Sequence, residues 1–367
     1  MAADLADVVR RFGPEYLERH GARMPPSHAR AIHDIADCRT EAMGGQLWHC
    51  PDCGQDVYVY HGCRNRHCPA CHADQTRKWL EARQAELLPC GYFHVTVTVP
   101  EEMRPVMRKN QKDGYGLLMR IAAEAVMTLC RDPKHLGATP AILSVLHTWT
   151  RTMDYHPHVH MLTSAGGVSE DGRNWLDAKP GFLVPVKALS RLVRRRMREE
   201  LAARHPDILD AVPKEVWRKE WVANILPWGG GKTGVLEYLA RYVFRIAISN
   251  SRLTDMDDST VVFKYKDRKK KRWRSCRLSG EEFLRRFLQH CLPPGFHKVR
   301  YYGLWHPAKR PLAARARLLP TPDIEPPTQT GTDAVSNMNS GFCRCPYCGG
   351  QKLEWRRDIP RPRSRSP

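Results

Sequence analysis

Two histidines on either side of a single valine are the residues of this chain whose type and spacing most clearly predict chemistry. They are His158 and His160, separated by Val159. Along a β-strand, residues two apart point to the same face, so both imidazoles can hold one divalent cation while Val159 faces the core. A cation held in this way can polarise a phosphodiester. We therefore predict a catalytic metal site at His158 and His160.

Two histidines are candidates for the third ligand of this predicted site. His147 and His156 are both close in sequence, and we favour His147 because it belongs to an adjacent predicted strand over residues 142–149. An alternative interpretation is that His158 and His160 are ordinary strand residues, which face solvent or are satisfied within the core.

Two tyrosines further along the chain, Tyr238 and Tyr242, supply candidate nucleophiles. Residues four apart share one face of a helix. A phenol beside a bound metal can attack phosphorus to give a phosphotyrosine intermediate. Arg241 and Arg245 flank the phenols, where guanidinium groups would bind the phosphate and favour its developing charge. The alternative is that both tyrosines are core residues, because aliphatic residues lie on the same helix.

The cysteines predict structural zinc, because many of the 13 recur in pairs separated by two residues. Cys50 and Cys53 form one pair, and Cys68 and Cys71 form another a short distance on. Their spacing is close to that of zinc ribbons, in which four thiolates bind one tetrahedral ion. We predict that these four cysteines hold one zinc ion.

Further candidate zinc ligands lie around and beyond these pairs. Cys38, His61 and Cys63 crowd the same region and are candidates for a second zinc ion, with the pairing left open. Cys345 and Cys348 form another pair near the C-terminus. This last pair is either half of a zinc site that is completed from elsewhere in the fold or an exposed, reducible tail.

The charge of the chain predicts a polyanionic partner. Lys and Arg number 59 against 39 Asp and Glu, which gives a formal net charge of +20. Arg64 and Arg66 in the zinc-binding region are candidate phosphate contacts. A dense run supplies the further candidates Lys269, Lys270, Lys271 and Arg272. Because Trp273 follows this run, a contact with DNA competes with a solvated hairpin tip as its interpretation.

Two function classes are not expected. Gly229–Lys232 lacks the GxxxxGK[ST] spacing of a phosphate loop, so we expect no nucleotide cofactor. No apolar run of about 18 residues and no apolar leader are evident, so we expect an intracellular protein without a membrane partner.

Apolar periodicity predicts the elements that must position these residues. Strands are expected at 93–99, 142–149, around His158, at 182–186, 261–265 and 273–277. Helices are expected at 73–88, 116–130, 187–204, 211–225, around the two tyrosines and at 281–291. The predicted domains are a helical lead (1–30), a zinc-binding domain (31–90), a catalytic domain (91–306), a linker (307–340) and a knuckle with a basic tail (341–367).

Taken together, these motifs resemble those of the HUH single-strand transposases, and most closely the two-tyrosine transposases of the insertion-sequence 91 family. The resemblance covers nearly the whole chain. It rests on these segments: Cys38–Thr40, Cys50–Gly54, Cys63–Cys71, Phe93–Pro100, Leu146–Trp149, His156–His160 and Tyr238–Arg252.

The resemblance implies an α+β fold, in which an HUH-type antiparallel sheet with packed helices follows a small zinc-bound module. It implies a metal-dependent endonuclease and strand transferase that acts on single-stranded DNA at the element's ends and target. His158 and His160 would bind Mg²⁺ or Mn²⁺, zinc would be structural, and Arg252 would join the DNA contacts. One tyrosine would attack, leaving the enzyme on the 5′ phosphate and freeing a 3′ hydroxyl. The expected location is the bacterial cytoplasm, with the nucleoid.

Two alternatives remain at this point. A plasmid or phage replication initiator uses the same chemistry, but it would be distinguished by origin binding or a helicase-like partner domain. A non-catalytic, zinc-dependent DNA-binding protein would explain the charge and the cysteine pairs, but it leaves the histidine and tyrosine pairs unexplained.

Overall fold

The structure is a computed structural model of the chain. It describes residues 4–71, 87–88, 90–228, 234–235, 238, 242–243, 246–267, 270–318 and 344–362. The chain divides into two compact units, each of which is formed by segments that are not continuous in sequence. The first unit comprises Met1–Gln75, Ile248–Cys291 and Pro327–Pro367, and the second comprises Thr76–Ala247 and Leu292–Pro326.

The second unit is built on a six-stranded sheet in which each pairing is antiparallel. Its strands run in the order β11 (Val299–Gly303), β4 (Ala138–Trp149), β5 (Tyr155–Ser169), β3 (Tyr92–Thr98) and β7 (Val222–Trp228), and β6 (Trp175–Asp177) also pairs with β5. The helices of this unit whose bounds the structure describes are α4 (Arg104–Lys109), α5 (Gln111–Arg131), α6 (Val186–Arg204), α7 (Pro206–Asp210) and α10 (Arg310–Ala316).

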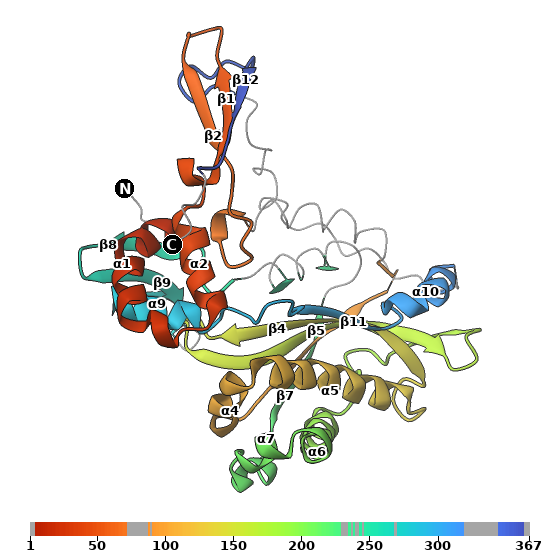
Figure 1. Cartoon of the computed structure of the whole chain (residues 1–367). Coiled ribbons are helices and arrows are strands. Elements are labelled where there is room, and N and C mark those ends of the chain that lie inside the picture. Colours follow the sequence, from red (N-terminus) through yellow and green to blue (C-terminus); the bar gives the residue numbers. More distant parts are fainter. Residues whose placement is uncertain are drawn as a thin grey trace. The chain divides into compact units, whose positions relative to one another are not determined.

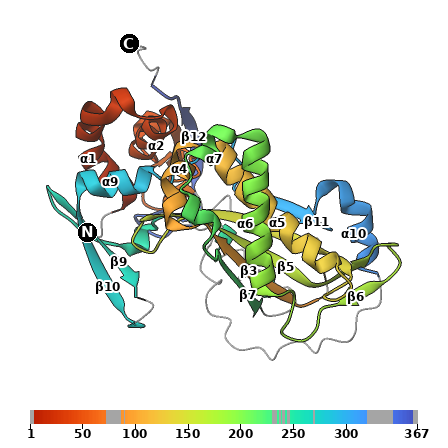
Figure 2. The same cartoon turned by 90° about the horizontal axis from the view of Figure 1, so that it is seen from below.

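One face of this sheet is covered by α5, which lies along β4 and β5 (Figure 1), and α6 packs beside α5 (Figure 2). Alternate strand residues such as Val97, Val159 and Met161 point into the core between sheet and helices. Alanines at 122, 123 and 125 are fully buried, so α5 can approach the strands closely. The opposite sheet face has a separate core, to which Tyr92, Leu162 and Val243 contribute.

The first unit contains a helical part and two three-stranded sheets. Its helices are α1 (Leu5–His20), α2 (Pro26–Ala36) and α9 (Gly280–Leu288). One sheet has the order β10 (Trp273–Ser279), β9 (Thr260–Lys266) and β8 (Leu253–Met256), and the other has the order β12 (Glu354–Ile359), β1 (Gly45–His49) and β2 (Asp56–Tyr60). Short 3-10 helices occur at Gly21–Arg23, Glu41–Met43, Glu101–Met103, Lys214–Trp217, Asn250–Arg252 and Pro307–Lys309.

Helix boundaries in the first unit follow from capping residues. Asp4 accepts a hydrogen bond from the Asp7 amide, and the Asp7 side chain accepts one from the Asp4 amide, which together cap α1. Ser279 caps α9 through the Glu282 amide. The two helices pack against each other, because Gly280 at the start of α9 lies against the Phe12 ring of α1.

The mixed helix-and-sheet class with antiparallel sheets is confirmed, as are most of the predicted strands. The predictions of a strand at 182–186 and of a helix at 211–225 are wrong, since the first range has no strand and the second ends in β7. The helix predicted at 73–88 lies almost wholly outside the described residues. The division into units also differs from the predicted domains, because residues 248–291 group with the N-terminal segment.

Within the part of the chain that the structure describes, no helix is both long and apolar enough to span a membrane.

Candidate active site and metal centres

Strand register in the second unit brings three of the predicted histidines together. His147 on β4 pairs directly with His158 on β5, and His160 lies two residues further along β5 on the same face. One ring nitrogen from each of the three lies within 4.8 Å of the others. His156, the alternative third ligand, is not part of this group.

Each of the three imidazoles has a polar partner at one of its ring nitrogens. His147 Nε2 donates to the Tyr242 carbonyl oxygen at 2.7 Å, and His158 Nδ1 donates to the His156 carbonyl oxygen at 2.6 Å. His160 Nδ1 lies 2.9 Å from His94 Nε2. A ring nitrogen that donates to a carbonyl leaves the other nitrogen unprotonated and able to bind a metal. His147, His158 and His160 therefore form a group that could hold a metal ion.

His94 is a member of this cluster that the sequence interpretation missed. It lies on β3, which pairs with β5 so that Thr96 stands opposite His160. The Thr96 hydroxyl is within 3.2 Å of His94 Nε2 and 3.3 Å of His160 Nδ1. The signal was present in the sequence, because the alternating strand 93–99 places His94 and Thr96 on its polar face.

The two tyrosines lie on the same sheet face as the histidines, but in different environments. The Tyr242 ring centroid is 4.3 Å from that of His160 and 4.6 Å from that of His94. Tyr238 is fully buried, and its hydroxyl has no hydrogen-bond partner among the described residues. Burial, with a smaller contribution from Tyr242, raises the pKa of Tyr238 well above its ordinary value. The two rings are 4.9 Å apart, so both sequence candidates reach the histidine cluster or its edge.

The predicted DNA-contacting residues are spread over the first unit and the tyrosine segment. Lys270, Lys271 and Arg272 are exposed at the tip between β9 and β10. Arg252 lies over the Phe263 ring at 5.4 Å. The predictions for Arg241, Arg245 and Lys269 fall outside the described residues.

Arg64 and Arg66 lie in the loop between two cysteines of the zinc-binding region. Arg64 is exposed and Arg66 is half-buried, and burial lowers the pKa of the Arg66 guanidinium. Of the two, Arg64 is the one whose side chain is more open to a phosphate.

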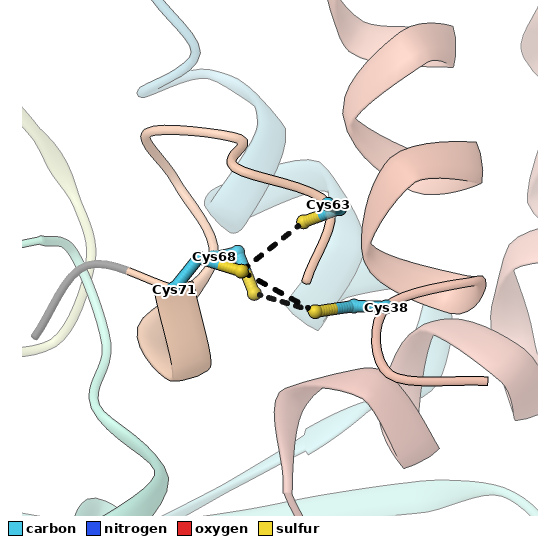
Figure 3. A group of neighbouring side chains, drawn as sticks. All are labelled: Cys38, Cys63, Cys68 and Cys71. Carbon is cyan, nitrogen blue, oxygen red and sulfur yellow. Dashed lines mark hydrogen bonds between the residues drawn. The ribbon is translucent and has the colours of Figure 1, made fainter. Parts of the chain in front are cut away.

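Four cysteines of the first unit form one compact group after α2 and β2: Cys38, Cys63, Cys68 and Cys71 (Figure 3). Their sulfur atoms are separated by 3.5 Å (Cys38 to Cys71), 3.6 Å (Cys38 to Cys68) and 3.8 Å (Cys63 to Cys71). Four thiolates around a tetrahedral zinc ion are about 3.8 Å apart, so this group has the geometry of a zinc site. Hydrogen bonds from Cys63 and then Cys68 lower the pKa of Cys38 to about 7.

A second group of four contains Cys50, Cys53, Cys345 and Cys348. The structure thus corrects the predicted grouping, because Cys50 and Cys53 do not join Cys68 and Cys71 in one set of four. The physical reason is that β12 pairs with β1 and brings the C-terminal cysteines back to the N-terminal pair. His61, a predicted candidate for the second ion, is exposed and belongs to neither group.

Two family models match this chain. Residues 141–311 match a family described as "Putative transposase", and residues 8–99 match a family described as "Transposase zinc-binding domain" of the insertion-sequence 91 type. The first range contains all three clustered ligand histidines and both tyrosines, and the second contains Cys38 through Cys71.

Two named transposases are similar to this chain over almost its whole length. The "Putative transposase y4qJ" of Sinorhizobium fredii is 39% identical, over 94% of this chain and 92% of its own length. The "Transposase for insertion sequence element IS801" of Pseudomonas savastanoi pv. phaseolicola is 28% identical, over 92% of this chain and 85% of its own length. No solved structure matches the chain.

The chain therefore belongs to the insertion-sequence 91 family of transposases. As a transposase it acts on DNA as a nuclease and strand-transfer enzyme. Its zinc-binding domain and its cysteine groups support structural zinc.

Proposed function

We propose that this transposase nicks and rejoins single-stranded DNA at the ends of its element through a 5′-phosphotyrosine intermediate, in HUH-type chemistry and rolling-circle-like movement. The observation that carries the proposal is the convergence of His147, His158 and His160 with Tyr242 on one face of one sheet. A histidine cluster for a metal and a phenol beside it are the two parts that such a reaction needs.

The donor set fits a divalent cation. His147, His158 and His160, each with a ring nitrogen within 4.8 Å of those of the other two, would hold it. When bound, the cation would polarise the scissile phosphate and stabilise the charge that develops on its oxygens. We propose Mg²⁺ or Mn²⁺, and Mn²⁺ is the first to test because imidazole ligands favour transition metals over Mg²⁺.

We propose Tyr242 as the nucleophile of the first cleavage. Its ring lies against His160, and its carbonyl oxygen accepts the hydrogen bond from His147, so the phenol is tied to the predicted metal site by side chain and main chain. Tyr238 precedes Tyr242 by four residues and is 0% exposed. Because a fully covered hydroxyl cannot reach a phosphate, Tyr238 has to become exposed before it can act in a second cleavage.

The covalent step exchanges one phosphorus–oxygen bond for another. The Tyr242 oxygen forms a bond to phosphorus, and the bond from phosphorus to the 3′ oxygen breaks. The phenol loses its proton and the departing 3′ oxygen gains one. Attack of a 3′ hydroxyl on the phosphotyrosine reverses this exchange, so that the strand is rejoined and the phenol is released.

The remaining parts of the chain would bind and deliver the DNA. We propose that Arg64, Arg66 and Arg252, together with the exposed Lys270, Lys271 and Arg272, contact phosphates of the single strand at the element's ends and in the target. These contacts would hold the strand, and we expect no nucleotide cofactor. Cleavage of the strand would take place in the second unit.

The test is cleavage of end-labelled single-stranded oligonucleotides that tile the element's ends, with Mn²⁺, with Mg²⁺ or with EDTA. We expect metal-dependent cleavage that leaves DNA covalently attached to the protein. Tyr242→Phe should lower the rate of first cleavage on the order of 10³-fold or more, as does loss of a nucleophile in other enzymes. Tyr238→Phe is the matched control and should retain first cleavage within about tenfold.

Loss of the adduct in Tyr238→Phe with retention in Tyr242→Phe would reverse the assignment of the two tyrosines. DNA binding without any adduct, by folded and zinc-loaded wild-type protein, would contradict the proposal and favour a non-catalytic DNA-binding protein.

A further inference from the structure

The two cysteine pairs of the second group have the same local structure, although nearly the whole chain separates them. Each has the sequence Cys-Pro-x-Cys-Gly, at Cys50–Gly54 and at Cys345–Gly349. In both, the first cysteine's amide donates to the carbonyl five residues on, at 2.9 Å from Cys50 to Gln55 and at 2.7 Å from Cys345 to Gly350. In both, the glycine's amide donates back to the first cysteine's carbonyl, at 2.8 Å and at 2.9 Å.

Both glycines adopt a left-handed backbone, with φ of 71° at Gly54 and 78° at Gly349. Glycine adopts this conformation without the steric cost that other residues incur. It therefore allows each chain segment to turn sharply just after its second cysteine. The amide of Gly350 also donates to Cys348 Sγ at 3.4 Å. Backbone N–H groups aimed at sulfur stabilise the thiolate form that binds metal.

The two turns bring their four sulfur atoms together, within 4.8 Å of one another. Cys50 Sγ is 3.6 Å from Cys348 Sγ, and Cys53 Sγ is 3.7 Å from Cys345 Sγ. Both distances match the spacing of about 3.8 Å for thiolates around zinc, and both far exceed the length of a disulfide bond, about 2.05 Å. All four cysteines are free.

The apolar cluster between the two turns is small. Among the described residues its buried members are Cys50, Val57 and Cys345, and two of these three are candidate ligands. Partly buried neighbours such as Trp48 and Leu353 cover the edge. So small an apolar cluster does not stabilise a three-stranded sheet, and modules of this size are ordinarily held by metal or disulfides.

We propose that Cys50, Cys53, Cys345 and Cys348 bind a second structural zinc ion that ties the C-terminal segment to the N-terminal zinc-binding domain. The site is separate from the Cys38 group, and half of it lies outside the matched zinc-binding range of residues 8–99. Zinc at this position fixes β12 beside β1, so the C-terminal knuckle is an integral part of the zinc-binding domain.

The test measures zinc content by mass spectrometry and amide hydrogen exchange in the full-length protein. We expect about two zinc ions per chain, one for each cysteine group. The double variant Cys345→Ser and Cys348→Ser should lose about one ion, and the amides of β12 and of its partner β1 should exchange at least tenfold faster, on the order of 1.4 kcal/mol of lost protection. The matched variant Cys38→Ser and Cys63→Ser should also lose one ion while the β12 amides stay protected.

A further variant keeps the proposal open to refutation if the double variant fails to fold. Cys348→His replaces one sulfur ligand by an imidazole that also binds zinc, so it should keep both ions and the protection of β12. Zinc content that is unchanged in the Cys345 and Cys348 double variant would overturn the proposal, as would a wild-type chain that binds one ion only. Disulfides between the two turns in protein purified under reducing conditions would also overturn it.

Discussion

At the residue scale, neighbouring polar side chains contact the imidazole of His160 in the histidine cluster. His160 is only 9% exposed, so its imidazole needs a hydrogen-bond partner. His94 and the Thr96 hydroxyl meet its Nδ1 from the neighbouring strand. We infer that His94 is a positioning residue, which holds the His160 ring with Nε2 directed to the proposed cation.

Replacing His94 by Phe tests this role, because Phe keeps the ring's bulk and removes its hydrogen bond. We expect Mn²⁺ affinity, measured by titration calorimetry, to fall about 10- to 100-fold, the usual cost of losing a hydrogen bond to a metal-bound histidine. His94→Gln retains an amide that can hydrogen-bond and should recover part of the loss. The control is His135→Phe, which alters a loop histidine of the same unit that contacts Phe182. Equal Mn²⁺ affinity in His94→Phe and wild type would exclude the positioning role.

The residue types of the site were predictable, whereas some of their partners were not. The spacing of His158 and His160 and that of Tyr238 and Tyr242 carries their chemistry within a few residues of sequence. His94 belongs to a strand more than 60 residues away, and only the register of β3 against β5 shows that it reaches His160. Register depends on the whole sheet, so a single strand's sequence does not reveal it.

At the element scale, strands and helices with clear periodicity were predicted, as was the exposed strand β10, whereas β7 was not. The alternation from Phe93 to Val99 predicted β3 to within about a residue. The end of the range 211–225 was predicted to be helical, but β7 begins at Val222 and pairs along β3 at the edge of the sheet. Here tertiary pairing outweighs a weak local preference.

One glycine at a strand end provides a test of this packing. Gly303, the last residue of β11, has a φ of 60°, and a Cβ there would lie 1.9 Å from the Pro140 carbonyl oxygen. Gly303→Ala therefore adds a clash with backbone to left-handed strain, and we expect it to lower the free energy of unfolding by roughly 2 kcal/mol or more in urea titrations. Gly181→Ala is the control, because its φ is 69° with no atom within 4 Å, and it should cost only about 1 kcal/mol. Equal costs for the two variants would show that the close approach to Pro140 contributes nothing.

At the scale of the whole molecule, the sequence predicted the parts but not how they combine. The cysteine pairs were each identified, and the possibility that Cys345 and Cys348 complete a site elsewhere was open. Which pairs share an ion depends on contacts between residues about 300 positions apart, and spacing cannot supply that information. The same holds for residues 248–291, which lie between segments of the second unit in sequence and yet group with the N-terminal one.

The net charge of +20 also acts at this scale, because a strongly basic chain binds single-stranded DNA with steep salt dependence. We expect the logarithm of the binding constant to fall linearly with the logarithm of salt concentration. Each lost phosphate contact should lower the slope by about 0.7, so the triple variant Lys270→Ala, Lys271→Ala and Arg272→Ala should lower it by about 2. Fluorescence anisotropy with a labelled oligonucleotide, measured over a salt series, gives both slopes.

A second triple variant separates local contact from total charge. Arg191, Arg195 and Arg198 are exposed on α6, and changing all three to Ala removes the same formal charge. If the tip between β9 and β10 contacts phosphates directly, the α6 variant should change the slope by less than about 0.5, because distant charges are screened beyond about 10 Å at 0.1 M salt. Equal slopes for the two variants would mean that the basic tip contributes only its share of the net charge, and the DNA path would then have to be sought elsewhere on the protein.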